Sequence, residues 1–415
     1  MEVILPAHPS GYLYAKLHEL GFSRIRAMRD WEKAKLSPNV ELTMLINSDD
    51  GKYVEDSALL VDVNGFKILD RNDCRLSEEY SRRVAPLDLL FTQFSGAHWY
   101  PVMWEYGLQE RQQKVDLFKK NLKEKFYERK SWLQPKVTVP SAGPACFLDK
   151  EYFDFNFNSI FPDAFEFGFG KDDGIQVLTP GQSLTLPDMK VEGKFDDRAY
   201  HDKEAYLREY QRDRAPAIHS YLSGLASIED EMLILRFSTY FQRLLTFDLA
   251  QRVKMLVCFN ISGRKVYLDF ENGLVSESPA REVNYEIRLD STFLKLIMDN
   301  ELLWEDFLLS MRFSVRRYSE IYNWPLFALL RFGYSNALMK IIEDGIRSTE
   351  TIQVGDYEIQ RYCPHSGQDL SEATIEGNVI TCPRHLWSFD LETGACVSGG
   401  NLCLKTKKLV PAKIQ

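Results

Sequence analysis

The sequence predicts a multidomain protein that combines an α/β part with an α+β part, and three observations support this fold class. The chain has 415 residues, which is more than one hydrophobic core usually supports. Runs typical of strands alternate with helical segments up to about Lys190, whereas helices and a hairpin dominate from about Phe195. A further unit begins near residue 350. We therefore expect domains at residues 1–190, 195–335 and 350–415.

The first domain has the alternation of a layered α/β fold. The amphipathic stretch at residues 12–22 predicts a helix that ends at Gly21. The charged stretch at residues 105–130 predicts a long surface helix. Short β-rich runs bounded by turn residues predict strands at 41–46, 57–63, 66–70, 88–95 and 135–140.

The second domain is predicted to be α+β and largely helical. The segment RVKMLVCFNISGRKVYLDF indicates a hairpin that turns at Ser262 and Gly263. A further helix between residues 333 and 351 is expected to connect this domain to the C-terminal unit. Other helices are predicted at 196–225, 227–245 and 290–313.

Composition and charge exclude several classes of protein. The 60 acidic and 51 basic residues are spread along the chain and give a net charge of -9, so no basic stripe is available to bind nucleic acid. The N-terminal segment lacks the pattern of a signal peptide, and the longest apolar runs are too short to span a membrane. The seven unevenly spaced cysteines argue against a secreted disulfide framework. We therefore expect a cytoplasmic protein.

Two short segments near the C-terminus, CPH and CPRH, concentrate metal-binding residue types. They supply Cys363 and His365 and then, after sixteen intervening residues, Cys382 and His385. A zinc finger usually pairs two cysteines in one turn and two histidines on one helix, whereas here each segment supplies one of each. A binuclear iron centre with two thiolates on one iron and two imidazoles on the other needs this mixed pairing. The spacing alone leaves zinc and a chance arrangement open.

The residues around these segments resemble the Rieske family. CPH is followed by SGQDL and CPRH by WSFDLETG, and the resemblance covers roughly residues 352–411. It implies an all-β C-terminal domain and a Rieske-type 2Fe-2S cluster held by Cys363, His365, Cys382 and His385. It also implies that the two imidazoles are exposed, so that electrons enter at the iron they hold.

The same resemblance implies a low reduction potential. High-potential Rieske proteins carry an extra cysteine in each loop and hydroxyl groups beyond the second histidine. Here Arg384 precedes His385, and Trp387 and Phe389 occupy the positions two and four beyond it. Without hydroxyl donors the reduced cluster is stabilised less, so we expect a potential of roughly −150 mV, at the low end of the Rieske range. Such a cluster suits delivery of electrons to an oxygenase.

The usual iron site of ring-hydroxylating oxygenases is not expected in this chain. That site needs two closely spaced histidines and a distant carboxylate. The histidines outside the CPH and CPRH segments are all far apart in the sequence: His8, His18, His98, His201 and His219.

Much of the remaining chain resembles CMP-N-acetylneuraminate hydroxylase and its bacterial relatives, which join a Rieske centre to a metallo-β-lactamase-fold domain. Residues 57–76, 87–104 and 135–147 are similar to the second half of that fold. Residues 300–323 resemble the C-terminal region of the family, and the hairpin at 258–272 with its helices resembles a small sterol-carrier-like fold. The resemblance implies a partial metallo-β-lactamase-like α/β domain at 1–190 and a sterol-carrier-like α+β domain at 195–335.

This resemblance also bears on a mononuclear or dinuclear metal site in the body of the protein. The H-x-H-x-D-H motif of the family would lie before Met1 and does not occur elsewhere in the chain. Asp73 falls where the fold places a metal-bridging carboxylate, although a turn residue at a strand end is an equal alternative. His98 is a weaker candidate ligand or substrate contact. We therefore expect that the chain cannot bind a complete metal pair.

Together these features favour a Rieske iron-sulfur oxidoreductase of the oxygenase or hydroxylase type, acting on an unidentified small molecule. Its electron donor would be a reductase acting through a ferredoxin or a cytochrome. Two alternatives stay open, namely a non-catalytic Rieske electron-transfer protein and a redox-sensing ligand-binding protein.

Overall fold

The structure, a computed structural model, divides into two compact units. The first unit comprises Met1–Ser48 and Glu55–Ser227, and the second comprises Asp49–Val54 and Ile228–Gln415. Helical residues that the sequence assigns to the middle domain, up to Ser227, thus belong to the first unit. The three predicted domains stay a proposal. The structure describes residues 2–47, 54–95, 98–157, 161–169, 174–225, 231–318, 322–365, 367–371, 373–382, 387–398 and 402–409.

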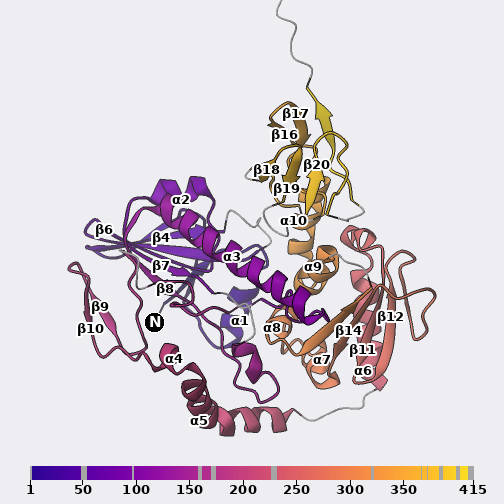
Figure 1. The fold of residues 1–415 in the computed structure, drawn as a ribbon, viewed down its shortest axis with the longest axis horizontal. Coiled ribbons are helices and arrows are strands. Elements are labelled where there is room, and N and C mark those ends of the chain that lie inside the picture. The colour runs from indigo at the N-terminus through magenta and orange to yellow at the C-terminus, as the bar shows by residue number, and fades with distance from the viewer. Residues whose placement is uncertain are drawn as a thin grey trace, which may run out of the picture. The chain divides into compact units, whose positions relative to one another are not determined.

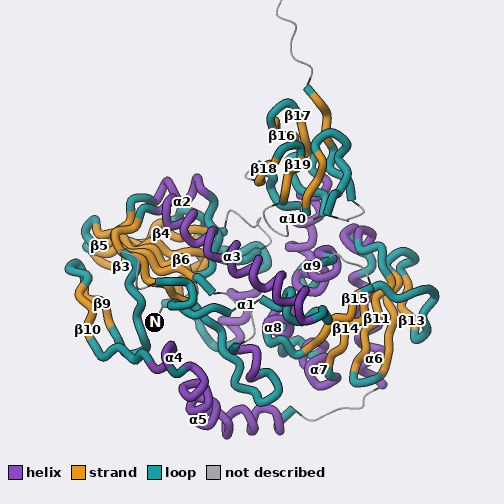
Figure 2. Tube along the Cα trace, in the orientation of Figure 1, coloured by secondary structure: helices purple, strands orange, loops and turns teal. Residues whose placement is uncertain are grey.

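A six-stranded mixed sheet forms the centre of the first unit (Figures 1 and 2). Its strands follow the chain order, and neighbours pair antiparallel from β3 to β6 and parallel from β6 to β8. The two parallel connections run through helices, as parallel pairing requires. The strands are β3 (Lys33–Ser37), β4 (Val40–Ile46), β5 (Ser57–Val63), β6 (Phe66–Asn72), β7 (Leu87–Gln93) and β8 (Pro135–Ser141).

The connecting helices α2 (Glu78–Val84) and α3 (Leu108–Leu133) pack against each other beside this sheet (Figure 1). Leu133 at the end of α3 joins a fully buried cluster with strand residues such as Leu69 and Leu90. An aromatic cluster, which includes Phe94, Phe126, Phe167 and Phe169, forms a second core. The predicted strands and the long helix of the first domain are therefore present.

Smaller elements complete the first unit. Strands β1 (Val3–Pro6) and β2 (Ile25–Met28) pair in parallel, with the predicted helix α1 (Tyr12–Glu19) between them in the chain. Gly21 follows α1 with a φ of 90°, a conformation that stops a helix and suits glycine. The remaining elements are η1 (Phe153–Asn156), β9 (Ser183–Thr185), β10 (Lys190–Glu192), α4 (Arg198–His201) and α5 (Lys203–Gly224).

The second unit contains a five-stranded sheet in the order β13-β12-β11-β14-β15. Strands β11 (Leu256–Ile261) and β12 (Arg264–Asp269) form the predicted hairpin, and its turn residues Ser262 and Gly263 have φ values of 47° and 94°. A two-residue turn of this kind requires positive φ at both positions, which explains the glycine. The other members are β13 (Leu274–Ser276), β14 (Tyr285–Leu289) and β15 (Phe313–Arg317), with helices α6 (Glu231–Leu244), α7 (Ser291–Met298) and α8 (Trp304–Leu309).

The predicted continuous helix over residues 290–313 is wrong in part. The segment forms two short helices, α7 and α8, and Phe313 already begins strand β15. Met311 has a φ of 58°, which ends the helical path, and β15 then pairs with β14. The gain from completing the sheet outweighs the helical periodicity of the apolar residues.

Three short helical elements are here called the helical platform, of which the first precedes β11 and the other two lead from β15 to the C-terminal region. They are η2 (Asp248–Arg252), α9 (Trp324–Phe332) and α10 (Asn336–Arg347). In α9 every residue except Arg331 is buried, which explains why its apolar residues show no helical period. The side chain of Asn323 caps α9 by accepting from Leu326 N, and it donates to Val253 O directly after η2. Asn323 thus joins η2 to α9.

The C-terminal region is built from two three-stranded antiparallel sheets, ordered β16-β17-β21 and β18-β19-β20. Its core contains Ile359, Leu370, Ile380 and Phe389, all nearly or fully buried. The expected all-β character of this region is confirmed. The strands are β16 (Thr351–Val354), β17 (Tyr357–Gln360), β18 (Thr374–Glu376), β19 (Val379–Thr381), β20 (Ser388–Asp390) and β21 (Thr406–Lys408).

Among the residues that the structure describes, no helix has the length and apolar composition needed to cross a membrane.

Candidate metal centre

The first candidate loop follows β17 and is closed by backbone hydrogen bonds. Cys363 N donates to Gln368 O at 2.7 Å, and Gly367 N donates to Cys363 O at 2.8 Å. Gly367 has a φ of 67°, a conformation that glycine adopts without strain. The loop therefore holds Cys363 and His365 in one tight turn.

The second candidate loop connects β19 to β20, which pair as a hairpin. Cys382 follows β19 directly, and its N–H donates to Trp387 O at 2.8 Å across the base of the loop. This bond fixes the Cys382 backbone at the mouth of the hairpin. His385 and Arg384 lie outside the described residues, so the fourth predicted ligand stays a prediction.

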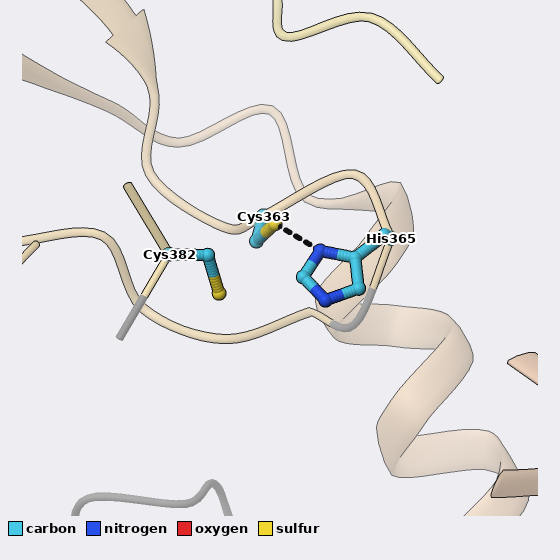
Figure 3. A group of neighbouring side chains, drawn as sticks. All are labelled: Cys363, His365 and Cys382. Carbon is cyan, nitrogen blue, oxygen red and sulfur yellow. Dashed lines mark hydrogen bonds between the residues drawn. The ribbon is translucent and has the colours of Figure 1, made fainter. Parts of the chain in front are cut away.

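The two loops bring three candidate ligands together (Figure 3). The ligating atoms of Cys363, His365 and Cys382 all lie within 4.8 Å of one another. The three side chains are buried, and Cys363 Sγ lies 2.6 Å from His365 Nδ1. Two thiols and an imidazole whose Nδ1 faces a sulfur form a donor set suited to a metal that binds sulfur and nitrogen.

His365 lies between two tryptophan rings. The Trp387 ring stacks on the imidazole with a centroid distance of 4.6 Å and an interplanar angle of 5°. The Trp324 ring, at the start of α9, meets the imidazole edge-on at 6.2 Å. His365 has no exposed surface. The expectation of an exposed imidazole is therefore wrong for His365, because aromatic side chains from two elements cover it.

The donor set fits a Rieske 2Fe-2S cluster. Such a cluster needs two cysteines on one iron and two histidines on the other, supplied by two facing loops. Cys363 and Cys382 come from different loops and face one buried space, with His365 beside them. One imidazole position is left for a residue of the second loop, where the sequence places His385.

Comparison with known proteins decides between this cluster and zinc. Residues 355–406 match the family described as "Rieske [2Fe-2S] domain". This region is a Rieske [2Fe-2S] domain. The expected position of the domain at the C-terminal end of a mixed α/β chain is thus confirmed.

The Rieske domain is shared with longer relatives. A protein of Mycobacterium tuberculosis named "Putative Rieske 2Fe-2S iron-sulfur protein" is 28% identical over 459 residues, which cover 98% of this chain and 85% of the relative. A protein of the same description from Mycolicibacterium smegmatis is 28% identical over 462 residues, with the same coverage. Over 42 residues, or 10% of this chain and 9% of the relative, the chain is 40% identical to cholesterol 7-desaturase of Hemicentrotus pulcherrimus.

Part of the chain is similar to a solved structure. Zn(2+)-bound PqqB from Methylobacterium extorquens covers 23% of this chain and 40% of its own, with a TM-score of 0.19 and 15% sequence identity. This likeness is too slight to carry an argument about the body. The metallo-β-lactamase-like and sterol-carrier-like parts of the predicted fold stay resemblances.

The helical platform holds the first loop of the Rieske domain. The Arg252 guanidinium in η2 donates to Pro364 O at 2.9 Å, next to His365. Burial lowers the pKa of Arg252. Gly367 lies against α10 so closely that a Cβ there would meet Ile342 O at 3.6 Å. Together with Trp324, these contacts fix the loop that carries Cys363 and His365.

The surroundings of the cysteines are rich in ring carbon. Phe389 is fully buried and Trp387 nearly so. The nearby hydroxyls of Thr381 and Ser388 bond to each other at 2.9 Å. Trp387 and Phe389, at the positions two and four beyond His385, therefore offer no hydroxyl to the cysteine sulfurs.

The candidate ligands in the first unit lie in different surroundings. Asp73 is exposed in the turn after β6. His98 is half-buried before α3, where its Nδ1 donates to Tyr100 O at 3.2 Å and its ring lies 5.3 Å from that of Phe118. In the described part of the chain, neither belongs to a group of three metal-ligating side chains. A metal in the body stays a prediction.

Sequence reasoning missed the platform residues Arg252 and Trp324. The one signal for Trp324 is the segment NWPLFALL, in which a cap residue and a proline precede an unbroken apolar run. Arg252 has no comparable signal in the sequence.

Proposed function

We propose that this protein is an oxidoreductase that transfers single electrons through a Rieske 2Fe-2S cluster held by Cys363, His365, Cys382 and His385. The observation that carries the proposal is the buried group of Cys363, His365 and Cys382 within a domain of the Rieske type. The cluster would supply a one-electron couple. The protein supplies the thiolates, one imidazole fixed between Trp324 and Trp387, and a site closed to water on that side.

The surroundings of the cluster site favour a low potential. Trp387 and Phe389 add ring carbon but no hydroxyl donor, so the reduced state gains little from hydrogen bonds at these two positions. A potential toward roughly −150 mV suits a donor of electrons to an oxygenase better than an acceptor of electrons from a quinol.

An oxygenase or hydroxylase reaction on a small molecule is the finer form of this proposal. The 40% identity over 42 residues to a protein named as a desaturase supports it. In this form a reductase acting through a ferredoxin or a cytochrome delivers electrons to the cluster, and a metal or substrate site in the body consumes them. Transfer of electrons without catalysis by this chain is the alternative, because Asp73 and His98 each lie outside a described ligand group.

Metal and sulfide analysis of the purified full chain tests both forms. Two irons and two acid-labile sulfides per chain, with an EPR signal of the reduced protein near an average g of about 1.9, are expected for the cluster. A third iron, or another tightly held metal, favours the oxygenase form, and two irons alone favour simple electron transfer. A colourless protein that holds zinc contradicts the proposal.

A further inference from the structure

A pocket in the second unit lies apart from the metal centre. Residues of α6, the C-terminal end of α7 and Tyr334 line it, and its cavity volume is about 540 Å³. Helices α6 and α7 pack against each other. The volume falls within the range of small-molecule sites, and it far exceeds what a bare inorganic ion fills.

The charged residues of the pocket lining are both arginines. Arg236 is already neutralised, because it donates to Asp299 Oδ1 and to Met298 O, each at 2.6 Å. Arg243 donates to Gly333 O at 2.6 Å and pairs with no carboxylate among the residues that the structure describes. The pocket therefore retains one uncompensated positive charge, at Arg243.

A buried hydroxyl lies beside this charge. The Tyr240 ring centroid is 5.5 Å from Arg243 Cζ, and the Arg243 guanidinium and the Trp304 ring N–H both face the Tyr240 hydroxyl. Within the described part of the chain, neither Tyr240 Oη nor Trp304 Nε1 makes a hydrogen bond, although both atoms are buried. The Tyr240 oxygen can accept from these two neighbours, and Arg243 already donates to Gly333 O, so among the described residues it is the phenol O–H that is left without an acceptor. Buried polar groups in native proteins nearly always have a partner.

The protonation state of Tyr240 agrees with a donor role. Burial raises the pKa of Tyr240 to about 12, so the phenol keeps its proton at neutral pH. A protonated phenol and a guanidinium can both donate to the same oxyanion. A neutral ligand would use the hydroxyl but would leave the charge of Arg243 without a counterion.

Apolar side chains complete the lining. Leu235 of α6 is 57% exposed, and Ile297 and Met298 at the end of α7 line the same pocket. A ligand with an apolar body would cover this surface while its charged group reached Arg243 and Tyr240.

We propose that this pocket binds a small organic carboxylate, whose charged group accepts hydrogen bonds from Arg243 and Tyr240 and whose apolar body lies against Leu235, Ile297 and Met298. The proposal goes beyond electron transfer and does not depend on it.

The test compares an acid with the matching alcohol on the cluster-loaded full chain. Isothermal titration calorimetry is carried out with 4-phenylbutyrate and with 4-phenylbutan-1-ol, which share one apolar body. The acid should bind at least about tenfold more tightly than the alcohol, because only the acid compensates Arg243. Tyr240→Phe should weaken binding of the acid by roughly three- to tenfold, the effect of losing one hydrogen bond.

Two further variants separate the pocket from general effects. Arg243→Gln keeps a donor for Gly333 O and should abolish the preference for the acid. Tyr318→Phe removes an exposed hydroxyl of the same unit and should change neither affinity. The proposal is overturned if the wild-type chain shows no saturable binding of the acid, if acid and alcohol bind equally, or if Tyr240→Phe binds the acid like the wild type. Thermal unfolding of each variant shows whether the fold is retained.

Discussion

The two units present metal-binding residue types in contrasting ways. In the second unit, Cys363, His365 and Cys382 converge within 4.8 Å in a buried space. In the first unit, Asp73 is exposed at a turn and His98 bonds to a backbone carbonyl. The difference lies in the scaffold, because two loops closed by backbone hydrogen bonds and covered by aromatic rings remove the C-terminal ligands from water. Ligand types along a sequence therefore become a metal site only where the fold buries them together.

The largest expected effect is loss of the cluster in Cys363→Ser or Cys382→Ser. A serine oxygen is a poor substitute for a thiolate on ferric iron, so iron, visible absorption and the reduced-state EPR signal should all disappear. Cys403→Ser is the matched control, since this cysteine is exposed, and it should retain the full iron content. A cluster that survives both ligand changes would contradict the assignment.

The next largest effect is expected for Trp324→Ala. The change leaves a cavity beside His365 and should lower the free energy of unfolding by about 3–5 kcal/mol, as measured by chemical denaturation. Entry of water also stabilises the more negative reduced cluster, so the midpoint potential should rise. Trp324→Phe keeps an aromatic ring at this position and should show a smaller loss of stability. An unchanged stability in Trp324→Ala would show that the ring does not cover His365.

Arg252→Met tests the electrostatic contribution of the helical platform. The change removes a positive charge and the hydrogen bond to Pro364 O while it keeps an apolar stem. The reduced cluster should then be less stable, and redox titration should give a midpoint potential lower by tens of millivolts. Arg264→Met, at the β11–β12 hairpin, is the control and should leave the potential unchanged. An equal shift in both variants would indicate a general charge effect.

Phe389→Tyr tests the hydroxyl argument with a smaller change. If the new hydroxyl reaches a cysteine sulfur, the midpoint potential should rise by tens of millivolts. A wild-type potential near roughly +300 mV, the top of the Rieske range, would show that other donors stabilise the reduced cluster.

The smallest expected effect is on metal binding by the first unit, and it tests the contrast between the two units directly. Asp73→Ala and His98→Ala should leave the metal content at the two irons of the cluster, because neither residue belongs to a group of three ligand side chains in the described part of the chain. Elemental analysis of the purified chains measures this. Loss of an additional iron or zinc in either variant would show that the first unit does build a site.

Local signals in the sequence predicted much of the fold. Ser262 and Gly263 predict the hairpin because few residue pairs adopt the positive φ values of its two-residue turn. The charged stretch of α3 predicts a surface helix from its own residues alone. The sequence did not predict the end of the helical segment between Asp290 and Phe313. Its apolar spacing suits a helix throughout, whereas β15 forms because it pairs with β14. The sequence singled out Cys363 and Cys382, which the structure brings together with His365, and their role as ligands stays a prediction. It could not predict the burial of His365, because Trp324 and Arg252 come from segments distant in the chain.

Helix α9 connects the cluster site to the pocket beside Arg243. It begins at Trp324, which contacts His365, and it ends beside Gly333, whose carbonyl accepts from Arg243 in the pocket. If occupation of the pocket moves this helix, the binding and redox equilibria share a coupling free energy, which must be the same in both directions. A ligand that shifts the one-electron potential by about 59 mV then binds the oxidised and reduced proteins with affinities that differ tenfold. A redox titration at two ligand concentrations would therefore measure the same quantity as two binding isotherms.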